Sequence, residues 1–315
     1  MATLTAALER YLSIRRAFGF DLSFEERVLR RFTALAEAEG TEHITVELFL
    51  RWKAHYGHAN NTTWAARLGM VRGFATWLGG IDPQTEVPPA GLIVSKLRRN
   101  RPYIFSDGQI AAIVAEAARL RSPYGLRGWT CATLFGLIAT TGLRISEAVA
   151  LDTRNVDLKH ATLTIERSKN GRSRVLPLAA STTAQLLAYR HERDRLLGAD
   201  HPPFFLFETG CRPTDYCARY TFAQICQRIG LRVPQRFNRH GRGPRIHDLR
   251  HTFAVRTIMD WYRRGLDPDR EMPKLSAYLG HIKPEYTYWY VQAVPELLQL
   301  ASERAEGNLA QGAVQ

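Results

Sequence analysis

Three kinds of side chain recur between Arg245 and Tyr290, and together they can break a phosphodiester. A guanidinium holds two non-bridging phosphate oxygens, an imidazole moves protons at neutral pH, and a phenol can attack phosphorus. Between Arg228 and Arg256, Asp248 is the only acid, so the carboxylate cluster of a two-metal nuclease is missing from this stretch. The sequence therefore predicts strand cleavage through a phosphotyrosine, with no metal and no cofactor.

Five short motifs carry these groups. In Thr-Gly-Leu-Arg-Ile-Ser-Glu, a glycine turn aims an arginine into a cleft, and a predicted hairpin then carries a lysine at its tip. The motifs His-Asp-Leu-Arg-His and Leu-Gly-His follow, and a tyrosine stands nine residues after the last histidine. The predicted catalytic residues are Arg144, Lys169, His247, Arg250, His281 and Tyr290.

Residues of the same type compete for two of these positions. Tyr288 is the alternative nucleophile, but it falls two residues short of the interval from His281. Lys159 is the alternative lysine, but Lys169 stands in the predicted turn, five residues before Arg174. Three further residues are expected to support the site, namely Glu147 and Asp248 as partners of the cations and His251 packed beneath them.

The net charge of +13 indicates a polyanionic partner. The first 94 residues hold ten basic and ten acidic side chains, so the whole excess lies after them. A merely solvated basic face is the alternative explanation. The residues predicted to contact double-stranded DNA lie in a basic segment, beside the hairpin tip and before the H-x-x-R motif: Lys96, Arg98, Arg99, Arg101, Arg172, Arg239, Arg242 and Arg245.

Cysteine use and hydropathy argue against several other classes. The four cysteines include no C-x-x-C pair and nothing at the N-terminus resembles a secretory signal, so reduced thiols in a cytoplasmic protein are expected. Zinc held by Cys211, Cys217 and a histidine is an alternative that the spacing disfavours. The uncharged run 128–143 is too short to span a bilayer and is predicted to be a buried helix.

The elements that must position these groups fall into two parts. Residues 1–80 read as four helices, with a capping box at Ser23, Phe24 on the apolar face of the second helix and Thr45 capping the third. A proline- and glycine-rich stretch and a basic run then break the helical pattern. The predicted organisation is a helical DNA-binding domain at 1–90, a basic linker at 91–104 and a catalytic domain at 105–315.

The predicted fold class is mainly α with a small antiparallel β-sheet. A capping box at Ser106 opens a helix, and strands at 161–165 and 174–178 form a hairpin around Ser-Lys-Asn-Gly. The remaining expected elements are helices at 181–197 and 216–229, an apolar strand at 204–207, an extended loop in the centre of 228–256, and a short helix from 295 with a loose end.

These motifs resemble those of the tyrosine recombinases, also called phage-type integrases. The similarity runs from Ser106 to about Val294 and rests on all five spaced motifs. The ending Tyr-Trp-Tyr-Val-Gln-Ala-Val-Pro-Glu-Leu-Leu is similar to the branch carried by transposons and multi-recombinase elements. The N-terminal part resembles the family's SAM-like core-binding domain in size and position. The resemblance thus implies a helical core-binding domain followed by an α+β catalytic domain.

The resemblance also implies a reaction. A site-specific recombinase of this kind cleaves and rejoins DNA through a 3′-phosphotyrosine, without metal or ATP, during integration, excision or transposition of a mobile element. The implied roles are nucleophile for Tyr290, grip on the non-bridging oxygens for Arg144 and Arg250, protonation of the 5′-oxygen for Lys169, base or phosphate donor for His247, and hydrogen-bond donor for His281.

The implied assembly is a homotetramer on two DNA duplexes with specific sites, with or without sister recombinases, in the bacterial cytoplasm. The tail beyond Val294 is then expected to pack on a neighbouring protomer, because a short terminal helix cannot bury its apolar face alone. A type IB topoisomerase uses a similar residue set and is the alternative within this chemistry. An accessory DNA-binding protein that cleaves nothing is the alternative of a different class.

Overall fold

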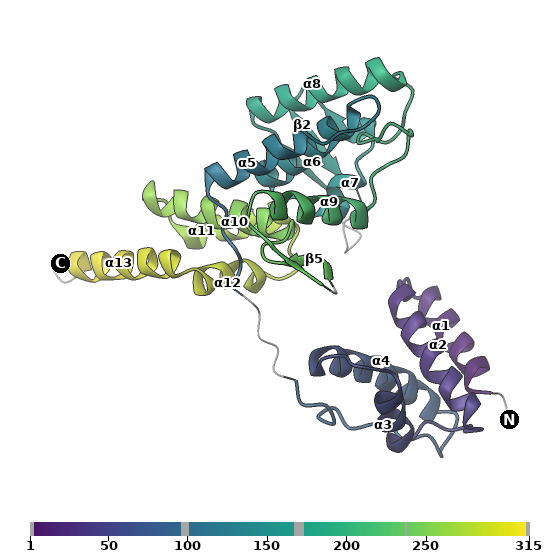
Figure 1. Ribbon diagram of the computed structural model, residues 1–315. Helices are drawn as coiled ribbons and strands as arrows, with labels where there is room; N and C mark the ends of the chain where they lie inside the picture. The colour runs from purple at the N-terminus through teal and green to yellow at the C-terminus, as the bar shows by residue number, and fades with distance from the viewer. Residues whose placement is uncertain (1–2, 96–100, 167–172, 237, 313–315) are drawn as a thin grey trace. The chain divides into compact units, whose positions relative to one another are not determined.

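The computed structural model divides the chain into two compact units, Met1–Arg99 and Asn100–Gln315 (Figure 1). It describes residues 3–95, 101–166, 173–236 and 238–312, with the backbone alone described for 238, 239 and 305–312. The division between the units falls inside the segment 91–104. Among the described residues, no helix combines the length and the apolar character needed to cross a membrane.

The N-terminal unit consists of helices around an aromatic core. Trp52 and Trp64 pack edge to face with ring centroids 5.1 Å apart, and both are nearly fully buried. As predicted, the hydroxyl of Thr45 accepts a hydrogen bond from the backbone N–H of Leu48 and caps the third helix. The helices are α1 (Leu4–Ala17), α2 (Ser23–Ala38), α3 (Val46–His55) and α4 (Asn61–Gly79).

The predicted start of α2 is wrong. Ser23 is the first residue of the helix rather than its cap, and the capping residue Leu22 makes no side-chain hydrogen bond. The backbone N–H of Ser23 donates instead to Asp21 at 3.1 Å, because a short carboxylate competes for the N–H groups of the following turn. Phe24, expected on the apolar face, is 54% exposed, and the buried face of the helix begins only at Val28.

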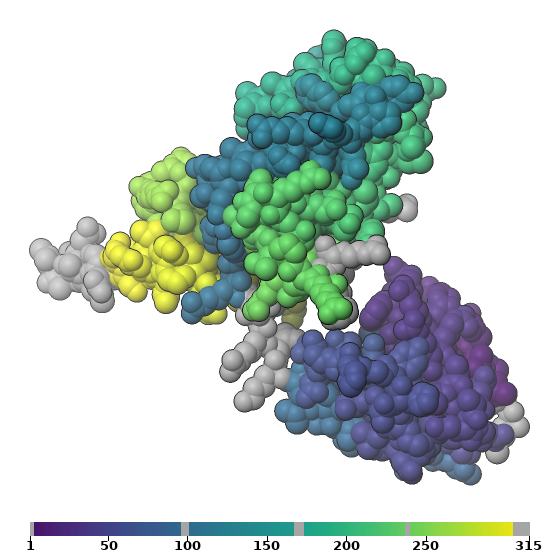
Figure 2. Space-filling view, in the orientation of Figure 1, coloured from purple at the N-terminus to yellow at the C-terminus, as the bar shows by residue number. Residues whose placement is uncertain are grey.

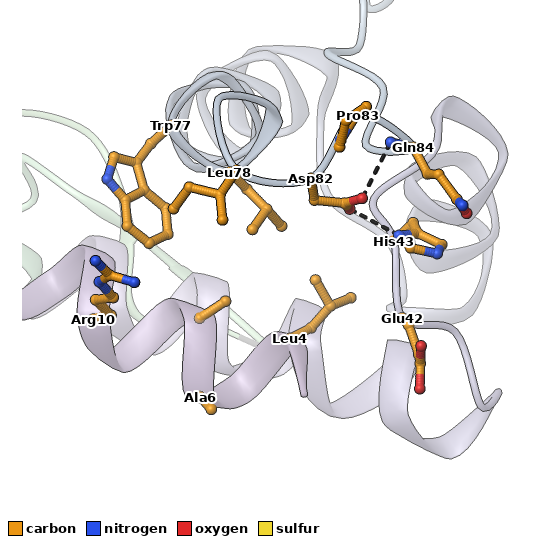
Figure 3. Close-up of a pocket in the computed structure, with 12 residues that line it drawn as sticks. Leu4, Ala6, Arg10, Glu42, His43, Trp77, Leu78, Asp82, Pro83 and Gln84 are labelled. Atoms are coloured by element: carbon orange, nitrogen blue, oxygen red, sulfur yellow. Dashed lines mark hydrogen bonds and ion pairs between the residues drawn. The ribbon is translucent and has the colours of Figure 1, made fainter. Parts of the chain in front are cut away.

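A mainly apolar pocket of about 530 Å³ lies in the N-terminal unit, between the start of α1 and the segment that follows α4 (Figure 3). Its polar edge is an ion pair of 2.8 Å between His43 Nδ1 and Asp82 Oδ2. Burial acts to raise the pKa of Asp82, but hydrogen bonds from Thr85 and His43 bring this pKa below its ordinary value. The ion pair therefore ties the segment after α4 to the start of α3, and the pocket contains none of the predicted catalytic residues.

The second unit is organised around α6 (Leu126–Thr141), which is buried along most of its length. The predicted capping box at Ser106 opens α5 (Asp107–Ala118). This helix, α8 (Ala180–Leu197) and α10 (His247–Arg263) all contact α6 (Figure 1). A second apolar cluster joins α10 to the helices after it, which are α11 (Pro268–Leu279), α12 (Glu285–Ala293) and α13 (Pro295–Gly312).

The predicted hairpin is present as part of a three-stranded antiparallel sheet. Its strands are β2 (Thr162–Ile165) and β3 (Arg174–Pro177), and Ile165 pairs with Arg174. A short strand that the sequence did not indicate, β1 (Val156–Asp157), pairs with the other edge of β2. The turn that carries Lys169 lies outside the described residues. The helices α7 (Ile145–Val149) and η1 (Thr153–Asn155) connect α6 to this sheet.

The strand predicted at 204–207 is not formed. Phe204 to Leu206 are all fully buried, so successive side chains do not alternate between protein and solvent. The backbone finds other partners, because the N–H of Phe204 donates to the carbonyl of Leu151 at 2.9 Å and that of Leu206 donates to Tyr189 Oη at 3.0 Å. A short apolar run has the same appearance in a sequence whether it is a buried strand or an irregular core segment.

The loop expected in the centre of 228–256 is a hairpin that one buried arginine closes. After α9 (Asp215–Arg228), strand β4 (Val233–Gln235) pairs with β5 (Asn238–Arg242). Arg232 is 7% exposed and donates to the carbonyls of the returning strand and the residues after it. Those carbonyls belong to His240, Gly241 and Gly243, each at 2.8 Å, and to Pro244.

The C-terminal helix is longer than predicted. It continues to Gly312 as α13, where the sequence indicated a short helix and a loose end. Leu297 is fully buried against the apolar cluster of α10 and α11, whereas Leu298 is 52% exposed. The first turn of the tail therefore packs on its own chain, and the packing of the tail on a neighbouring protomer stays a prediction.

Candidate active site

Backbone carbonyls hold two of the predicted arginines at the ends of α6 and α11. Arg250, in the first turns of α10, is 1% exposed and donates to the carbonyls of Gly142 and Leu279, both at 2.7 Å. Arg144, just before α7, donates to the carbonyl of Gly280 at 2.8 Å. A guanidinium has five N–H donors, and these bonds do not use all of them. The carbonyls at these two helix ends therefore position both cations, and the carbonyl bonds leave further N–H groups of each guanidinium unused.

Glycine is required at both of these helix ends. Gly142 has φ +63°, and a Cβ there would lie 2.5 Å from the ring of Phe253. Gly280 has φ +67°, and a Cβ there would lie 3.0 Å from Arg174 Nη1. Each glycine combines a left-handed backbone with a close neighbour, so any other residue would move the carbonyls that hold the arginines.

A buried carboxylate orients the cations, as the sequence indicated for Glu147. It accepts hydrogen bonds from Arg144 Nη1 at 2.8 Å and from Arg174 Nη2 at 2.9 Å. Burial acts to raise the pKa of Glu147, but the bonds from Arg174 and from the backbone of Arg144 bring it below its ordinary value. Arg174 also donates to the carbonyl of Tyr278 at 2.8 Å. The sequence used Arg174 only to locate the hairpin, so its part in positioning Arg144 was missed.

Glu147→Gln is expected to lower the free energy of unfolding by on the order of 3 kcal/mol at neutral pH, because it leaves two partly buried arginines without their shared counter-charge. The folded pKa of Glu147 lies below the ordinary 4.5, so its stabilisation is complete above that pH and is lost as the pH falls through the folded pKa. Urea unfolding between pH 3 and 7 should show the difference from wild type shrinking below about pH 4.5. A difference that stays constant over this range contradicts the assignment. The exposed pair of Glu192 and Arg195 provides the control, because Glu192→Gln should change stability by less than about 1 kcal/mol.

Three histidines approach the arginines, and all three have depressed pKa values. Burial followed by the charge of Arg250 lowers the pKa of His247 to about 4, although one side of the ring is open to solvent. Burial followed by His247 lowers the pKa of His251 to about 3. Burial followed by Arg250 and Arg144 lowers the pKa of His281 to about 3. The imidazoles are therefore neutral at physiological pH, so each can accept a proton or donate its single N–H.

A chain of hydroxyl groups fixes the ring of His281. Its Nδ1 lies 2.7 Å from Thr287 Oγ1, which in turn lies 2.6 Å from Ser276 Oγ. Thr287 is fully buried. When Thr287 donates to Nδ1, the ring carries its proton on Nε2, which is the form that can donate to a phosphate oxygen.

The predicted nucleophile forms a hydrogen bond with a histidine. Tyr290, on α12, is 2% exposed, and its Oη lies 2.9 Å from Nδ1 of His251 on α10. His251 also meets the ring of His247 edge to face, with centroids 4.6 Å apart. The expectation that His251 packs beneath the site is therefore incomplete, because its ring touches the phenol itself.

The two other tyrosines of α12 face different surroundings. Tyr288 is 38% exposed and its hydroxyl donates to Asp269 at 3.2 Å. Burial, followed by the charge of Asp269, raises the pKa of this phenol, which makes it harder to ionise. Tyr286 is 40% exposed. Of the three, Tyr290 is the one bonded to His251.

The predicted DNA-contacting residues are only partly described. Arg101, Arg242 and Arg245 are exposed, as a contact with DNA requires. The backbone N–H of Arg245 donates to Asp248 at 2.6 Å, which fixes the start of α10. Arg239 lies on β5 with its backbone alone described. The predicted residues that lie outside the described ranges are Lys96, Arg98, Arg99, Lys169 and Arg172.

A basic pocket of about 440 Å³ opens beside His247. It lies between α9 and the β4–β5 hairpin, on the part of the surface coloured green in Figure 2. Its lining combines the apolar residues Phe222, Ala223 and Ile246 with Arg219, Arg232, Arg245 and two histidines, His240 and His247. His247 therefore belongs both to this pocket and to the cluster of arginines and histidines.

Comparison with known proteins identifies the class. The sequence pattern of the phage integrase family matches residues 106–296. A putative integrase/recombinase of Sinorhizobium fredii, y4rB, is 40% identical over 311 residues, which cover 97% of this chain and 98% of the relative. Tyrosine recombinase XerC of Roseiflexus sp. is 27% identical over 260 residues, or 81% of this chain and 75% of the relative. The chain belongs to the phage integrase family and is a site-specific tyrosine recombinase, which confirms the recombinase interpretation over the topoisomerase alternative.

Solved structures show the same fold. The integrase of transposon Tn1549, in complex with transposon right-end DNA, has a TM-score of 0.64 at 12% identity, covering 96% of this chain and 99% of that chain. The XerH recombinase bound to its palindromic difH substrate has a TM-score of 0.62 at 19% identity, covering 89% and 78%. The predicted class, mainly α with a small antiparallel sheet, is thereby confirmed.

Proposed function

We propose that this recombinase cleaves DNA by attack of Tyr290 on the scissile phosphorus, leaving a 3′-phosphotyrosine and a free 5′-hydroxyl. The observation that supports this most directly is the hydrogen bond of 2.9 Å between Tyr290 Oη and a neutral histidine on α10. On the same helix, Arg250 is held by two carbonyls with further donors available. A phenol, a proton acceptor and a fixed cation are the groups that attack on a phosphodiester requires.

Each remaining residue has a place in this reaction. Arg144 and Arg250 bind the non-bridging oxygens, where negative charge concentrates in the transition state. His281 donates a hydrogen bond to the same phosphate, and His247, at the mouth of the basic pocket, binds phosphate from the solvent side. Lys169 protonates the departing 5′-oxygen. The energy of the broken bond stays in the phosphotyrosine, so a second 5′-hydroxyl can reverse the step.

We also propose how the chain engages DNA. The exposed arginines beside the pocket bind phosphates next to the scissile one, and the basic segment 96–101 follows the duplex between the two domains. Such contacts provide affinity and register rather than sequence reading. The N-terminal unit, as the core-binding domain, and a tetramer on two specific sites complete the assembly, alone or with sister recombinases, on a mobile element in the bacterial cytoplasm.

Tyr290→Phe is expected to abolish the covalent protein–DNA complex while leaving DNA binding intact. The assay uses a nicked duplex from the ends of the chain's own element, which traps the intermediate because the short 5′ fragment diffuses away. Tyr288→Phe and Tyr286→Phe are matched controls from the same helix and should still form the complex. A covalent complex with Tyr290→Phe, or its loss only with Tyr288→Phe, moves the nucleophile elsewhere.

A further inference from the structure

We propose that His251 takes the proton from Tyr290 as the phenol oxygen attacks phosphorus. This role rests on the proposed function, because it takes Tyr290 as the nucleophile. His251 Nδ1 lies 2.9 Å from Tyr290 Oη, which is within reach of a general base. The family resemblance implied the role of base or phosphate donor for His247, and His251 was expected only to pack beneath the site.

The other two histidines, His247 and His281, contact partners other than Tyr290. His281 turns its Nδ1 to Thr287 Oγ1 at 2.7 Å. His247 meets the ring of His251 edge to face, one turn earlier on α10 and on its solvent-facing side. Of the three imidazoles near the arginines, His251 is the one whose ring nitrogen forms a hydrogen bond with Tyr290 Oη.

Two helices hold the histidine and the phenol in this arrangement. Their ring centroids are 5.5 Å apart at an angle of 63°. The ring of Trp289 packs against His251 with centroids 5.8 Å apart. Tyr290 is 2% exposed, so water has little access to the phenol and cannot readily serve as its proton acceptor. The bond therefore belongs to a packed interface between α10 and α12 rather than to a surface encounter.

The charged groups around His251 make its basicity depend on whether a phosphodiester is bound. The groups that face it are His247, Arg245 and Arg250 from α10 and its start, and His281 from the segment after α11; burial and these groups keep the ring neutral. A neutral imidazole with its proton on Nε2 offers the Nδ1 lone pair to the phenol. When a phosphodiester monoanion binds the arginines, its charge offsets their repulsion and raises the pKa of the ring. His251 thus becomes a stronger base once the phosphate is in place.

The bonds balance in both directions. In cleavage, the bond from Tyr290 Oη to phosphorus forms, the bond from phosphorus to O5′ breaks, the phenol proton moves to His251 Nδ1, and the leaving 5′-oxygen gains a proton from Lys169. In rejoining, a 5′-hydroxyl attacks phosphorus and gives its proton to the neutral Lys169, the bond from phosphorus to Tyr290 Oη breaks, and His251 returns its proton to the phenol oxygen. One histidine therefore acts first as general base and then as general acid, without any further reactant.

Two substitutions separate proton transfer from positioning. In His251→Asn, an amide oxygen replaces Nδ1 and can accept the hydrogen bond of Tyr290, but it cannot take the proton. In His251→Phe, the ring packing remains and the acceptor is lost. Both variants should bind DNA like wild type and form the covalent complex more slowly by about 10²–10⁴ fold in single-turnover assays. His160→Phe, at an exposed histidine paired with Asp157, is the control and should react at the wild-type rate.

The pH dependence of the Asn variant gives the second readout. Its rate should rise about tenfold per pH unit between pH 7 and 9, because ionised phenol then forms only by loss of a proton to solvent, and an ordinary tyrosine phenol ionises only near pH 10. A fluorinated, more acidic tyrosine at position 290 should restore much of the rate in this variant and change the wild type far less. If His251→Asn reacts at the wild-type rate while His251→Phe is slow, His251 does not take the proton. The same conclusion follows if His251→Asn is slow and neither a higher pH nor the fluorinated tyrosine restores its rate. Failure of the proposed function is distinguishable, since Tyr290→Phe would then still form the complex.

Discussion

Replacing Arg250 with lysine is expected to slow strand cleavage by about 10²–10³ fold although the positive charge is kept, which is the usual cost of losing one donor to a developing oxyanion. Arg250 uses Nη1 and Nη2 to hold the carbonyls of Gly142 and Leu279, both at 2.7 Å. A lysine has a single ammonium and cannot bridge both carbonyls and also donate to a phosphate. The substitution therefore separates the shape of the guanidinium from its charge.

The same change should destabilise the fold, because Arg250 is 1% exposed and one of its two carbonyl partners would lose its donor. That loss costs about 1–3 kcal/mol for each buried group left unpaired. Single-turnover cleavage, DNA binding and urea unfolding should be measured together. Arg264→Lys, at an exposed pair with Asp260 on the last turn of the same helix, is the matched control. Cleavage within tenfold of wild type in Arg250→Lys would show that charge alone is sufficient at this position.

Lys169→Ala should slow cleavage of ordinary DNA by on the order of 10²–10⁴ fold, the usual contribution of a general acid. The reason is that a 5′-alkoxide is a poor leaving group unless it is protonated. A bridging 5′-phosphorothioate replaces this oxygen with sulfur, whose thiol is far more acidic, close to the pKa of about 8.5 of cysteine. The thio substrate should therefore restore most of the rate that Lys169→Ala loses.

Two other variants control this experiment. Arg250→Lys should show no such rescue, because Arg250 acts on the non-bridging oxygens. Lys159→Ala should cleave ordinary DNA normally, because Lys159 lies in the turn between β1 and β2. If the thio substrate fails to rescue Lys169→Ala, or rescues Lys159→Ala instead, the hairpin lysine does not supply the proton.

The sequence predicts most of the fold because its helices are amphipathic and long. The predictions fail where a local sequence pattern is compatible with two different structures. The apolar residues 204–207 match a buried strand, but in the structure they form an irregular segment whose N–H groups donate to Tyr189 Oη and to the carbonyl of Leu151. The glycines of 228–256 indicate a loop, whereas Arg232 closes them into a hairpin by reaching four carbonyls. Contacts made by a side chain with a distant backbone are invisible to periodicity.

The candidate active site also contains residues that the sequence predicts and residues whose part only the structure reveals. Spacing alone predicts Arg144, Arg250 and Tyr290, because each lies in one of the short motifs that resemble those of the family. It does not reveal that His251 touches Tyr290, since these residues are 39 positions apart and their contact depends on how α12 packs on α10. The role of Arg174 was missed for the same reason, because its partner Glu147 lies 27 positions earlier. The residues proposed to bind the phosphate lie in sequence motifs, whereas the residues that position them are found only in the folded structure.

The buried guanidinium of Arg232 has a consequence for how relatives of this chain can diverge. It fixes the shape of the β4–β5 hairpin through backbone carbonyls, which every amino acid possesses. Gly241 is the exception on that strand, because a Cβ there would lie 2.3 Å from the carbonyl of Val233. The backbone geometry of the hairpin therefore depends directly on Arg232 and Gly241. We expect relatives to keep Arg232 and Gly241 while the exposed positions around them drift to suit different DNA ends, so that new target preferences arise without refolding the active site.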